Sequence, residues 1–297
     1  MSRPEIFSTI AALRGVIGDW RAESARIAFV PTMGALHAGH ISLVEIAQKA
    51  ADRTIVSIFV NPKQFAAGED FHRYPRPLEA DLEKLGGAGV DAVFVPEVYE
   101  IYPTGFATAV SVAGPATAGL EDRFRPTHFQ GVATVVAKLL IAASPDVAIF
   151  GEKDFQQLQV IRRLVLDLAL PVEIIGAPIA READGLALSS RNAYLSDAER
   201  TLAPALNAAL RNCAGKIEQG EPIADALDAA RAEATAAGFV LDYLELRDAE
   251  TLAVVKTIDD RSCRLLVAAY LGRTRLIDNV AVLGLSALSD RRESSDR

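Results

Sequence analysis

Cysteine is scarce in this chain of 297 residues: it occurs only at Cys213 and Cys263, and no CxxC pair is present. Two widely separated thiols argue against a disulfide framework and against a structural zinc site, and they favour a reducing compartment. Long apolar runs are missing too, since no stretch reaches the roughly 20 charge-poor residues that a membrane-spanning helix needs. We therefore expect a soluble cytoplasmic protein without a membrane partner.

Positive charge is not in excess either. The 31 lysines and arginines are outnumbered by 39 aspartates and glutamates, which gives a formal net charge of −8. This balance argues against nucleic acid as a partner, but it allows a small basic pocket for an anionic ligand. Half of the residues are hydrophobic, so a chain of this length can bury one large core or two smaller ones.

The first twenty residues do not resemble a targeting segment. Their apolar positions recur at helical spacing, at Ile6, Ile10, Leu13 and Ile17, and Asp19 interrupts the run. This pattern is typical of a helix that packs on the surface of a domain, rather than of a signal peptide.

Short β-branched runs alternate with helical patterns between residues 26 and 181. The expected strands are 26–32, 54–60, 91–97, 146–151 and 172–178, and the expected helices lie near 39–51, 77–86, 130–143 and 154–169. Each strand is a nearly continuous apolar run, as in parallel sheets that are covered on both faces. The alternation predicts the α/β class, with a Rossmann-like doubly wound parallel sheet.

Polar residues follow four of these strands directly. The stretches are PTMGALHAGH (31–40), NPKQF (61–65), PEVY (96–99) and GEKDFQQ (151–157). In open α/β sheets, ligands bind in the crevice outside the carboxyl ends of the strands. We therefore expect the four stretches to contribute to one pocket.

The sequence changes in character after Arg191. The stretches 196–213 and 221–237 have helical spacing, and FVLDYLELRD, TLAVV and RLLVAAYLG resemble strands joined by turns. We expect residues 1–183 to form the first domain and residues 184–284 a smaller C-terminal α+β domain. The polar residues 285–297 are expected to be a disordered tail.

His37 and His40 stand three residues apart after the first expected strand. The pair could bind a metal, but zinc needs further ligands and the HExxH pattern is absent. It could also simply cap the following helix. The third interpretation is anion binding, because Gly34 and Gly39 would let the backbone approach a phosphate at a helix N-terminus. All three remain open here, and the neighbouring strand ends favour the third.

Two further stretches contain donors for an anion. GEKDFQQ lacks the GxxxxGK[ST] pattern of a P-loop, but Lys153 occupies a first helical turn, where the helix dipole disfavours a cation unless an anion binds nearby. Ser189, Ser190 and Arg191 follow one another in LALSSRN, where a capped turn with a surface arginine is the alternative. The neutral Gln64, like Asn61, suits hydroxyls or a carboxylate.

The combination of motifs resembles one family. PTMGALHAGH has the H-x-G-H pattern of the nucleotidyltransferase superfamily related to class I aminoacyl-tRNA synthetases. Together with FVNPKQF, YPR, RPTHFQGV, FGEKDFQQL and DGLALSSRN, it resembles the pantothenate synthetases from about residue 5 to the LIDN at 276–279. The resemblance implies an ATP- and Mg²⁺-dependent homodimeric ligase. Such an enzyme joins pantoate to β-alanine through a pantoyl adenylate and releases pyrophosphate and AMP.

The resemblance also implies roles for individual residues, with the first domain binding nucleotide and pantoate and the second acting as a lid. Catalytic roles are expected for His40, which corresponds to the family's proposed proton donor, and for His37, Lys153, Ser189, Ser190 and Arg191. The expected ATP contacts are Met33, Gly34, Ala35, Leu36, His37, Ala38, Gly39, His40, Gly151, Glu152, Lys153, Asp154, Ala180, Leu188, Ser189, Ser190 and Arg191. The expected substrate contacts are Gln64, Gln157, Asn61, Tyr74 and His128.

Two positions depart from the family pattern. Lys63 stands where family members often have methionine, and we expect it to face solvent. The segment after YPR has fewer acidic residues, which leaves Glu79 and Asp81 as metal-site candidates, and we predict Asp81 as the ligand.

Three alternatives differ in chemistry. A related adenylyl- or cytidylyltransferase would use another acceptor, and a zinc hydrolase would use the histidines as ligands. A synthetase-like RNA-binding module is disfavoured by the acidic balance and by the lack of an interleaved basic and aromatic patch.

Overall fold

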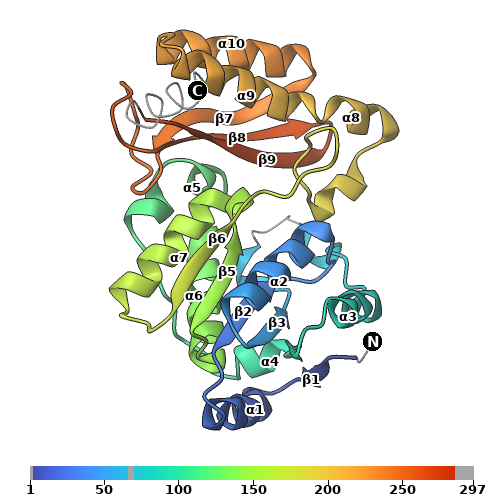
Figure 1. The fold of residues 1–297 in the computed structure, drawn as a ribbon. Helices are drawn as coiled ribbons and strands as arrows, with labels where there is room; N and C mark the ends of the chain where they lie inside the picture. Colours follow the sequence, from blue (N-terminus) through green and yellow to red (C-terminus); the bar gives the residue numbers. More distant parts are fainter. Residues whose placement is uncertain (1–2, 66–69, 285–297) are drawn as a thin grey trace, which may run out of the picture. The chain divides into compact units, whose positions relative to one another are not determined.

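The computed structural model describes residues 3–65 and 70–284, and these divide into two compact units (Figure 1). The first comprises the described residues up to Glu152 together with Gln156–Ala180. The second comprises Lys153–Phe155 and the described residues from Arg181 onward. The expected tail, 285–297, lies outside the described residues.

The first unit contains a parallel sheet of six strands in the order β1-β4-β3-β2-β5-β6. The strands are β1 (Glu5–Phe7), β2 (Ile27–Thr32), β3 (Arg53–Ile58), β4 (Ala92–Phe94), β5 (Val147–Gly151) and β6 (Glu173–Ala177). All five expected strands are present, and the Rossmann-like prediction is confirmed. The prediction missed β1, because Ile6 was included in the helical pattern, whereas this residue lies in the strand and is 42% exposed.

Helices cover both faces of this sheet (Figure 1). They are α1 (Ile10–Ala22), α2 (Ala38–Ala50), α3 (Leu78–Gly87), α4 (Val98–Ile101), α5 (Glu121–Phe124), α6 (His128–Ala143) and α7 (Phe155–Asp167). Short 3₁₀ turns follow some strands and loops: η1 (Pro62–Gln64), η2 (Asp70–His72), η3 (Gly114–Thr117) and η4 (Glu152–Asp154). The four helices expected between the strands are found within two residues of their predicted bounds.

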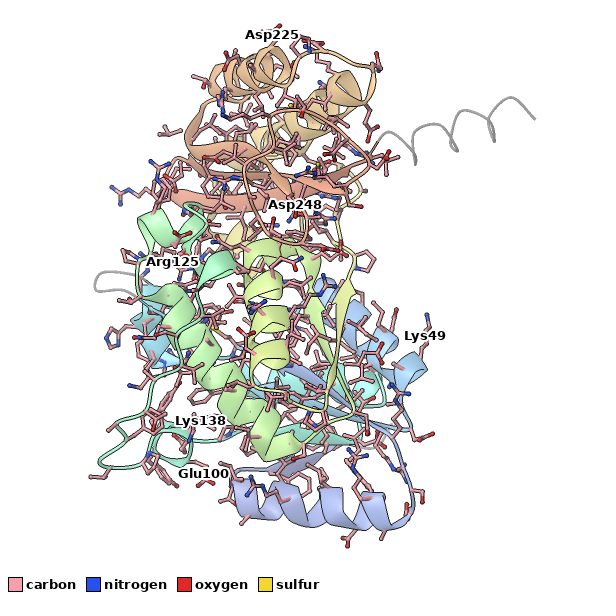
Figure 2. All side chains as sticks on the ribbon, turned by 90° about the vertical axis from the view of Figure 1, so that its left-hand side faces the viewer. Lys49, Glu100, Arg125, Lys138, Asp225 and Asp248 are labelled. Atoms are coloured by element: carbon pink, nitrogen blue, oxygen red, sulfur yellow. The ribbon has the colours of Figure 1, made fainter. Side chains whose placement is uncertain are left out.

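Alternate residues of each strand belong to opposite faces. In β2, Ile27 and Phe29 lie in one buried cluster with side chains of α1, α6 and α7. Ala28 and Val30 lie in a second cluster with side chains of α2 and α3. Figure 2 shows α6 and α7 side by side over the first of these faces. The strands are therefore nearly continuous apolar runs because both of their faces are buried.

The strand order reverses at β2. From this strand the chain continues to β3 and β4 on one side, and it later returns to β5 and β6 on the other. The carboxyl ends of β2 and β5 therefore flank the switch point, where open α/β sheets bind their ligands. The segments that leave these two ends are residues 33–37 and Gly151–Glu152.

The second unit packs helices on an antiparallel sheet, as the α+β prediction required. Its strands are β7 (Phe239–Asp248), β8 (Cys263–Leu271) and β9 (Thr274–Val282), in the order β7-β8-β9. Its helices are α8 (Asp197–Leu202), α9 (Ala205–Glu218) and α10 (Ile223–Ala236), preceded by η5 (Ser190–Tyr194). No helix in the described part of the chain is long and apolar enough to cross a membrane.

Two predictions for this unit were wrong in detail. Residues 196–213 form two helices, because Pro204 cannot continue the hydrogen-bond ladder of α8 and instead precedes the first turn of α9. The TLAVV stretch makes a single bridge between Val254 and Arg247 rather than a strand. Val254 is 61% exposed, so a period-two apolar face is not buried there.

Asp146 connects the start of β2 to α1. Its carboxylate accepts hydrogen bonds from Arg21 Nη1 at 2.9 and 2.7 Å and from the amide of Ile27 at 2.7 Å. Burial alone would raise the pKa of this carboxyl, but the bonds from Arg21 and Ile27 outweigh it, so the pKa lies below its ordinary value. A depressed pKa contributes stability above the unfolded-state pKa, and this stability is lost as the pH falls through the folded-state pKa.

We expect Asp146→Asn to lower the free energy of unfolding at neutral pH by about 1 kcal/mol, as for a partly exposed charged hydrogen bond. The deficit should shrink as the pH falls from about 4, the ordinary pKa of the unfolded-state carboxyl, through the lower folded-state pKa, where the wild-type carboxylate loses its charge too. Urea unfolding between neutral and acidic pH measures both effects. Asp167→Asn, which removes an exposed i,i+4 pair with Arg163, is the control. A deficit independent of pH would contradict this role.

Candidate active site

The turn that leaves β2 has a left-handed backbone at two successive residues, Gly34 at φ +79° and Ala35 at φ +51°. A Cβ atom at Gly34 would lie 3.0 Å from Ile58 Cγ2 and 3.1 Å from Asp81 Oδ2, so glycine is needed for space as well as for conformation. The Thr32 hydroxyl donates to the carbonyl of Ser57 at 2.7 Å and accepts from the Gly34 amide at 3.2 Å.

Asp81 holds this turn from the first turn of α3. Its Oδ2 accepts from the Ala35 amide and its Oδ1 from the Leu36 amide, both at 2.8 Å. Lys84, one turn further along α3, donates to the Leu36 carbonyl at 2.6 Å. Asp81 is 1% exposed, so these bonds form in a dry environment. They offset the strain of a non-glycine residue in the left-handed region, which costs about 1 kcal/mol or more.

These contacts bear on the predicted metal role of Asp81. Each of its carboxylate oxygens already accepts an amide hydrogen bond. Within residues 3–65 and 70–284, no three His, Cys, Asp or Glu side chains gather in a group that could hold a metal ion. The structure thus gives Asp81 a contact that the sequence did not suggest, namely support of the turn after β2.

The two histidines form the N-terminal cap of α2. His37 Nδ1 accepts from the amide of Gly39 at 3.2 Å, and His40 Nδ1 accepts from the amide of His37 at 3.3 Å. Because Nδ1 accepts in both rings, each neutral imidazole carries its proton on Nε2. The Nδ1 atoms of both histidines therefore cap the helix, as the capping interpretation predicts. The hydrogen-bond donor of each ring is then its Nε2–H group.

Gly39 leaves room for the His37 ring in this arrangement. A Cβ atom there would lie 3.0 Å from both Cε1 and Nδ1 of His37, closer than nearly all real contacts. The same added atom would lie 3.5 Å from the Cβ of Ala180, which places this predicted ATP contact beside the capped helix start. The two ring centroids of His37 and His40 are 4.1 Å apart.

Asn61 orients Gln64 at the end of β3. Asn61 is 1% exposed, and its Nδ2 donates to Gln64 Oε1 at 3.0 Å and to the carbonyl of Gly131 at 3.2 Å. Its Oδ1 accepts from the Tyr102 hydroxyl at 2.8 Å. With Oε1 engaged in this way, the Nε2 of Gln64 donates to Met33 Sδ at 2.9 Å. Two of the predicted strand ends are therefore joined by direct contact.

His128 supports the same glutamine through its backbone. Its Nδ1 lies 3.0 Å from the Gln64 carbonyl, and its Nε2 lies 3.3 Å from Arg125 Nη1. A guanidinium can only donate, so Nε2 accepts and the Nδ1–H donates to the carbonyl. His128 was predicted to contact substrate, and that stays a prediction; its contacts here support the backbone of Gln64.

Gly131 and Arg125 were missed by sequence reasoning. A Cβ atom at Gly131 would lie 2.1 Å from the Lys63 carbonyl oxygen, so only glycine lets α6 approach η1 this closely. Arg125 also donates to the Gln64 carbonyl at 3.4 Å. Both residues stand in RPTHFQGV, and a glycine inside a helical pattern was the available sign of a close backbone approach.

The remaining first-unit candidates differ in burial. Tyr74 is 6% exposed and packs edge-on against Phe65, with the ring centroids 6.1 Å apart. Gln157 is half-buried, whereas its buried neighbour Gln156 donates to the Pro115 carbonyl and to Asp122.

Lys63 is exposed, with its ammonium 5.2 and 5.3 Å from the Tyr102 and Phe106 ring centroids. Gly151 ends β5 and Glu152 follows it.

The other predicted residues belong to the second unit. Lys153 has a side chain that is 20% exposed, with Nζ 3.8 Å from a carboxylate oxygen of Asp154. Ser189 caps η5, since its Oγ accepts from the amide of Arg191 at 3.2 Å. Ser190 opens this turn, and Leu188 precedes the cap. The candidate residues that follow β2 and β3 thus contact one another through Gln64 and Met33, and a second set of candidates belongs to the other unit.

Comparison with known proteins gives one consistent result. A family model described as pantoate–beta-alanine ligase matches residues 5–281. Pantothenate synthetases from Rhodopseudomonas palustris and Mesorhizobium japonicum are 55% and 56% identical to this chain over 283 residues. The matches cover 95% of this chain and 100% and 99% of those proteins.

Solved structures agree with these matches. A pantothenate synthetase from Thermus thermophilus is 48% identical, with a TM-score of 0.88 over 94% of this chain and 99% of that one. A pantoate–beta-alanine ligase from Francisella tularensis is 34% identical, with a TM-score of 0.77 over 93% and 97% of the two chains. That structure was solved in complex with beta-gamma ATP and beta-alanine.

We expect Asp81→Asn to loosen the turn after β2, because an amide offers one acceptor oxygen and sets its NH₂ group against a backbone N–H. The free energy of unfolding should fall by about 1–3 kcal/mol, the cost of an unsatisfied buried polar group. Amide hydrogen exchange should accelerate at Ala35 and Leu36. The exposed Glu83→Gln on the same helix serves as the control. Unchanged exchange at both amides would show that Asp81 does not hold the turn.

Proposed function

The chain belongs to the pantoate–β-alanine ligase family, and from this premise we propose how its residues condense pantoate with β-alanine at the expense of ATP. In the first step a pantoate carboxylate oxygen bonds to the α-phosphorus of ATP, and the bond to pyrophosphate breaks. In the second step the amine of β-alanine bonds to the acyl carbon of pantoyl adenylate. The bond to AMP then breaks and the ammonium group loses a proton. AMP is a far better leaving group than the oxide of a free carboxylate.

The first step brings an anion to a polyanion. Pantoate is already ionised near neutral pH, so the step needs little general base catalysis. It needs donors that neutralise charge and hold the two reactants in line. The observation that carries this proposal is the paired cap of α2, whose two Nδ1 acceptors set the tautomers of His37 and His40 with the proton on Nε2. We assign both Nε2–H donors to phosphate oxygens of ATP.

We also assign the donors of the second unit to the phosphates of ATP. Lys153 and Arg191 supply full positive charges, and Ser189 and Ser190 supply hydroxyls. Asp154 suits the ribose hydroxyls. The nucleotide is further contacted by main-chain and small groups, namely residues 33–40, Gly151, Glu152, Ala180 and Leu188.

The organic substrates lie nearer the end of β3. Gln64 binds pantoate and β-alanine, and the hydrogen bonds of Asn61 and Met33 fix the orientation of its amide beforehand. Gln157 binds pantoate from α7, and Tyr74 borders this region. His128 acts through the Gln64 backbone. A preoriented neutral amide suits hydroxyl and carboxylate groups because it adds no charge that must be desolvated.

Mg²⁺ accompanies ATP in this proposal and binds through phosphate oxygens and water, as this ion commonly does. When bound, it supplies positive charge to the phosphates. Asp81, the predicted ligand, is 1% exposed and both of its oxygens accept amide bonds of the turn, so we assign it to the turn in preference to the ion. We assign the ion no protein ligand. A homodimeric assembly and a cytoplasmic location remain predictions.

We expect sustained AMP formation by the purified chain only when ATP, pantoate and β-alanine are all present. Pantoate alone should support exchange of pyrophosphate into ATP, since the adenylate forms before the amine is used. Coupled AMP detection and labelled pyrophosphate measure the two half-reactions separately. Exchange that requires a different acid or nucleotide, and not pantoate, would assign the chain to another reaction of the superfamily.

Lys153→Ala should lower pantoate-dependent exchange on the order of 100-fold, the usual loss when one donor to developing charge is removed. His40→Ala should lower it similarly, with a further loss of about 1 kcal/mol of stability from the helix cap. Exchange rates and thermal midpoints distinguish the two effects. The control is Lys49→Ala, an exposed lysine in the last turn of α2 (Figure 2). Exchange at the wild-type rate in either variant would remove that residue from the phosphate site.

A further inference from the structure

Asn279 of β9 contacts the backbone of Lys153. Its Nδ2 donates to the Lys153 carbonyl at 3.0 Å, and its Oδ1 accepts from Arg264 Nε at 2.5 Å. Asn279 is 1% exposed, so both bonds are shielded from water. All three residues belong to the second unit, where β8 and β9 lie side by side (Figure 1).

Arg264 reaches the same segment in a second way. Its guanidinium lies over the ring of Phe155, 4.5 Å from the ring centroid. A stacked arginine near an aromatic face is attracted by the ring quadrupole, more strongly when it is desolvated. The sheet of the second unit therefore contacts both ends of the segment Lys153–Phe155, at the carbonyl of its first residue and at the ring of its last.

The neighbouring residue anchors another candidate segment. Asp278 is 5% exposed and accepts both terminal nitrogens of Arg181 at 2.8 Å, as well as Asn207 Nδ2 at 3.0 Å. It also accepts from the amide of Asn279 at 2.7 Å. Arg181 bridges to Ala187, two residues before the Ser189 cap. The two polar residues of the LIDN stretch thus support both segments that carry predicted phosphate donors of this unit. Asn279 contacts Lys153 directly, and Asp278 holds Arg181, which bridges to the segment before Ser189.

We propose that Asn279 is a positioning residue for the ATP half-reaction. It acts through Lys153 by fixing the peptide from which that side chain extends. This inference rests on the proposed role of Lys153 in binding phosphate. A lysine has a long flexible stem, so a defined ammonium position requires a defined backbone. Displacement of a binding group by about 1 Å can cost on the order of 100-fold in rate.

A double-mutant cycle tests this assignment. Asn279→Ala should lower pantoate-dependent ATP–pyrophosphate exchange by about tenfold, since Lys153 is then present but less well placed. In a Lys153→Ala background the same change should have no further effect, because the side chain that it positions is gone. A purely structural role would instead give losses that multiply. Multiplied losses, or wild-type exchange in the single variant, would overturn the proposal.

Further variants keep the test decisive. Asn279→Asp retains an acceptor for Arg264 and replaces the donor to Lys153 by a carboxylate oxygen, so it replaces the alanine variant in the cycle if that variant does not fold. Asn212→Ala, an exposed asparagine that contacts Glu233 in the same unit, is the matched control and should leave exchange unchanged. Absence of pantoate-dependent exchange in the wild type would refute the proposed function itself, an outcome distinct from additivity in the cycle.

Discussion

The two amide bonds that Asp81 accepts from Ala35 and Leu36 determine how the chain leaves β2. A left-handed pair of residues reverses the chain only if something holds it, because Ala35 is strained there. With the turn fixed, His37 reaches the N-cap of α2 in an extended conformation, and His40 follows one turn later. The direction of α2, the tautomers of both histidines and the place of Met33 beside Gln64 all follow from this turn.

The switch point in strand order explains why these residues are neighbours at all. Parallel strands deliver their carboxyl ends to one edge, and the reversal at β2 separates the helices that leave β2 and β5. The sequence at that edge then decides the chemistry. Two neutral imidazoles offer donors to anions without adding buried charge to a crowded helix start, where the N-terminal dipole already favours an anion. In the proposed mechanism, full positive charges come from Lys153 and Arg191.

Most of the fold could be predicted because burial leaves a regular pattern. Strands covered on both faces are nearly continuous apolar runs, and helices with one covered face have apolar residues at helical spacing. The pattern failed for β1, a three-residue edge strand with an exposed isoleucine, and for Val254, which makes only a bridge. The candidate residues were found from motifs. The hydrogen bonds that support them could not be predicted, since Asp81 lies 45 positions from Leu36 and Asn279 lies 126 positions from Lys153.

The supports share a physical property that explains why they are polar. Asn61, Asp81, His128 and Asn279 are all buried, and each makes a hydrogen bond to a main-chain atom of a segment that carries a candidate residue. Apolar contacts could stabilise the same segments, but they are non-directional and leave the rotation of a peptide undetermined. A buried hydrogen bond specifies that rotation, because leaving its partner unsatisfied costs about 1–3 kcal/mol. Burial of these groups thus adds little net stability. It fixes the orientation of the segments that carry the candidate residues, and the proposed in-line attack at phosphorus depends on that orientation.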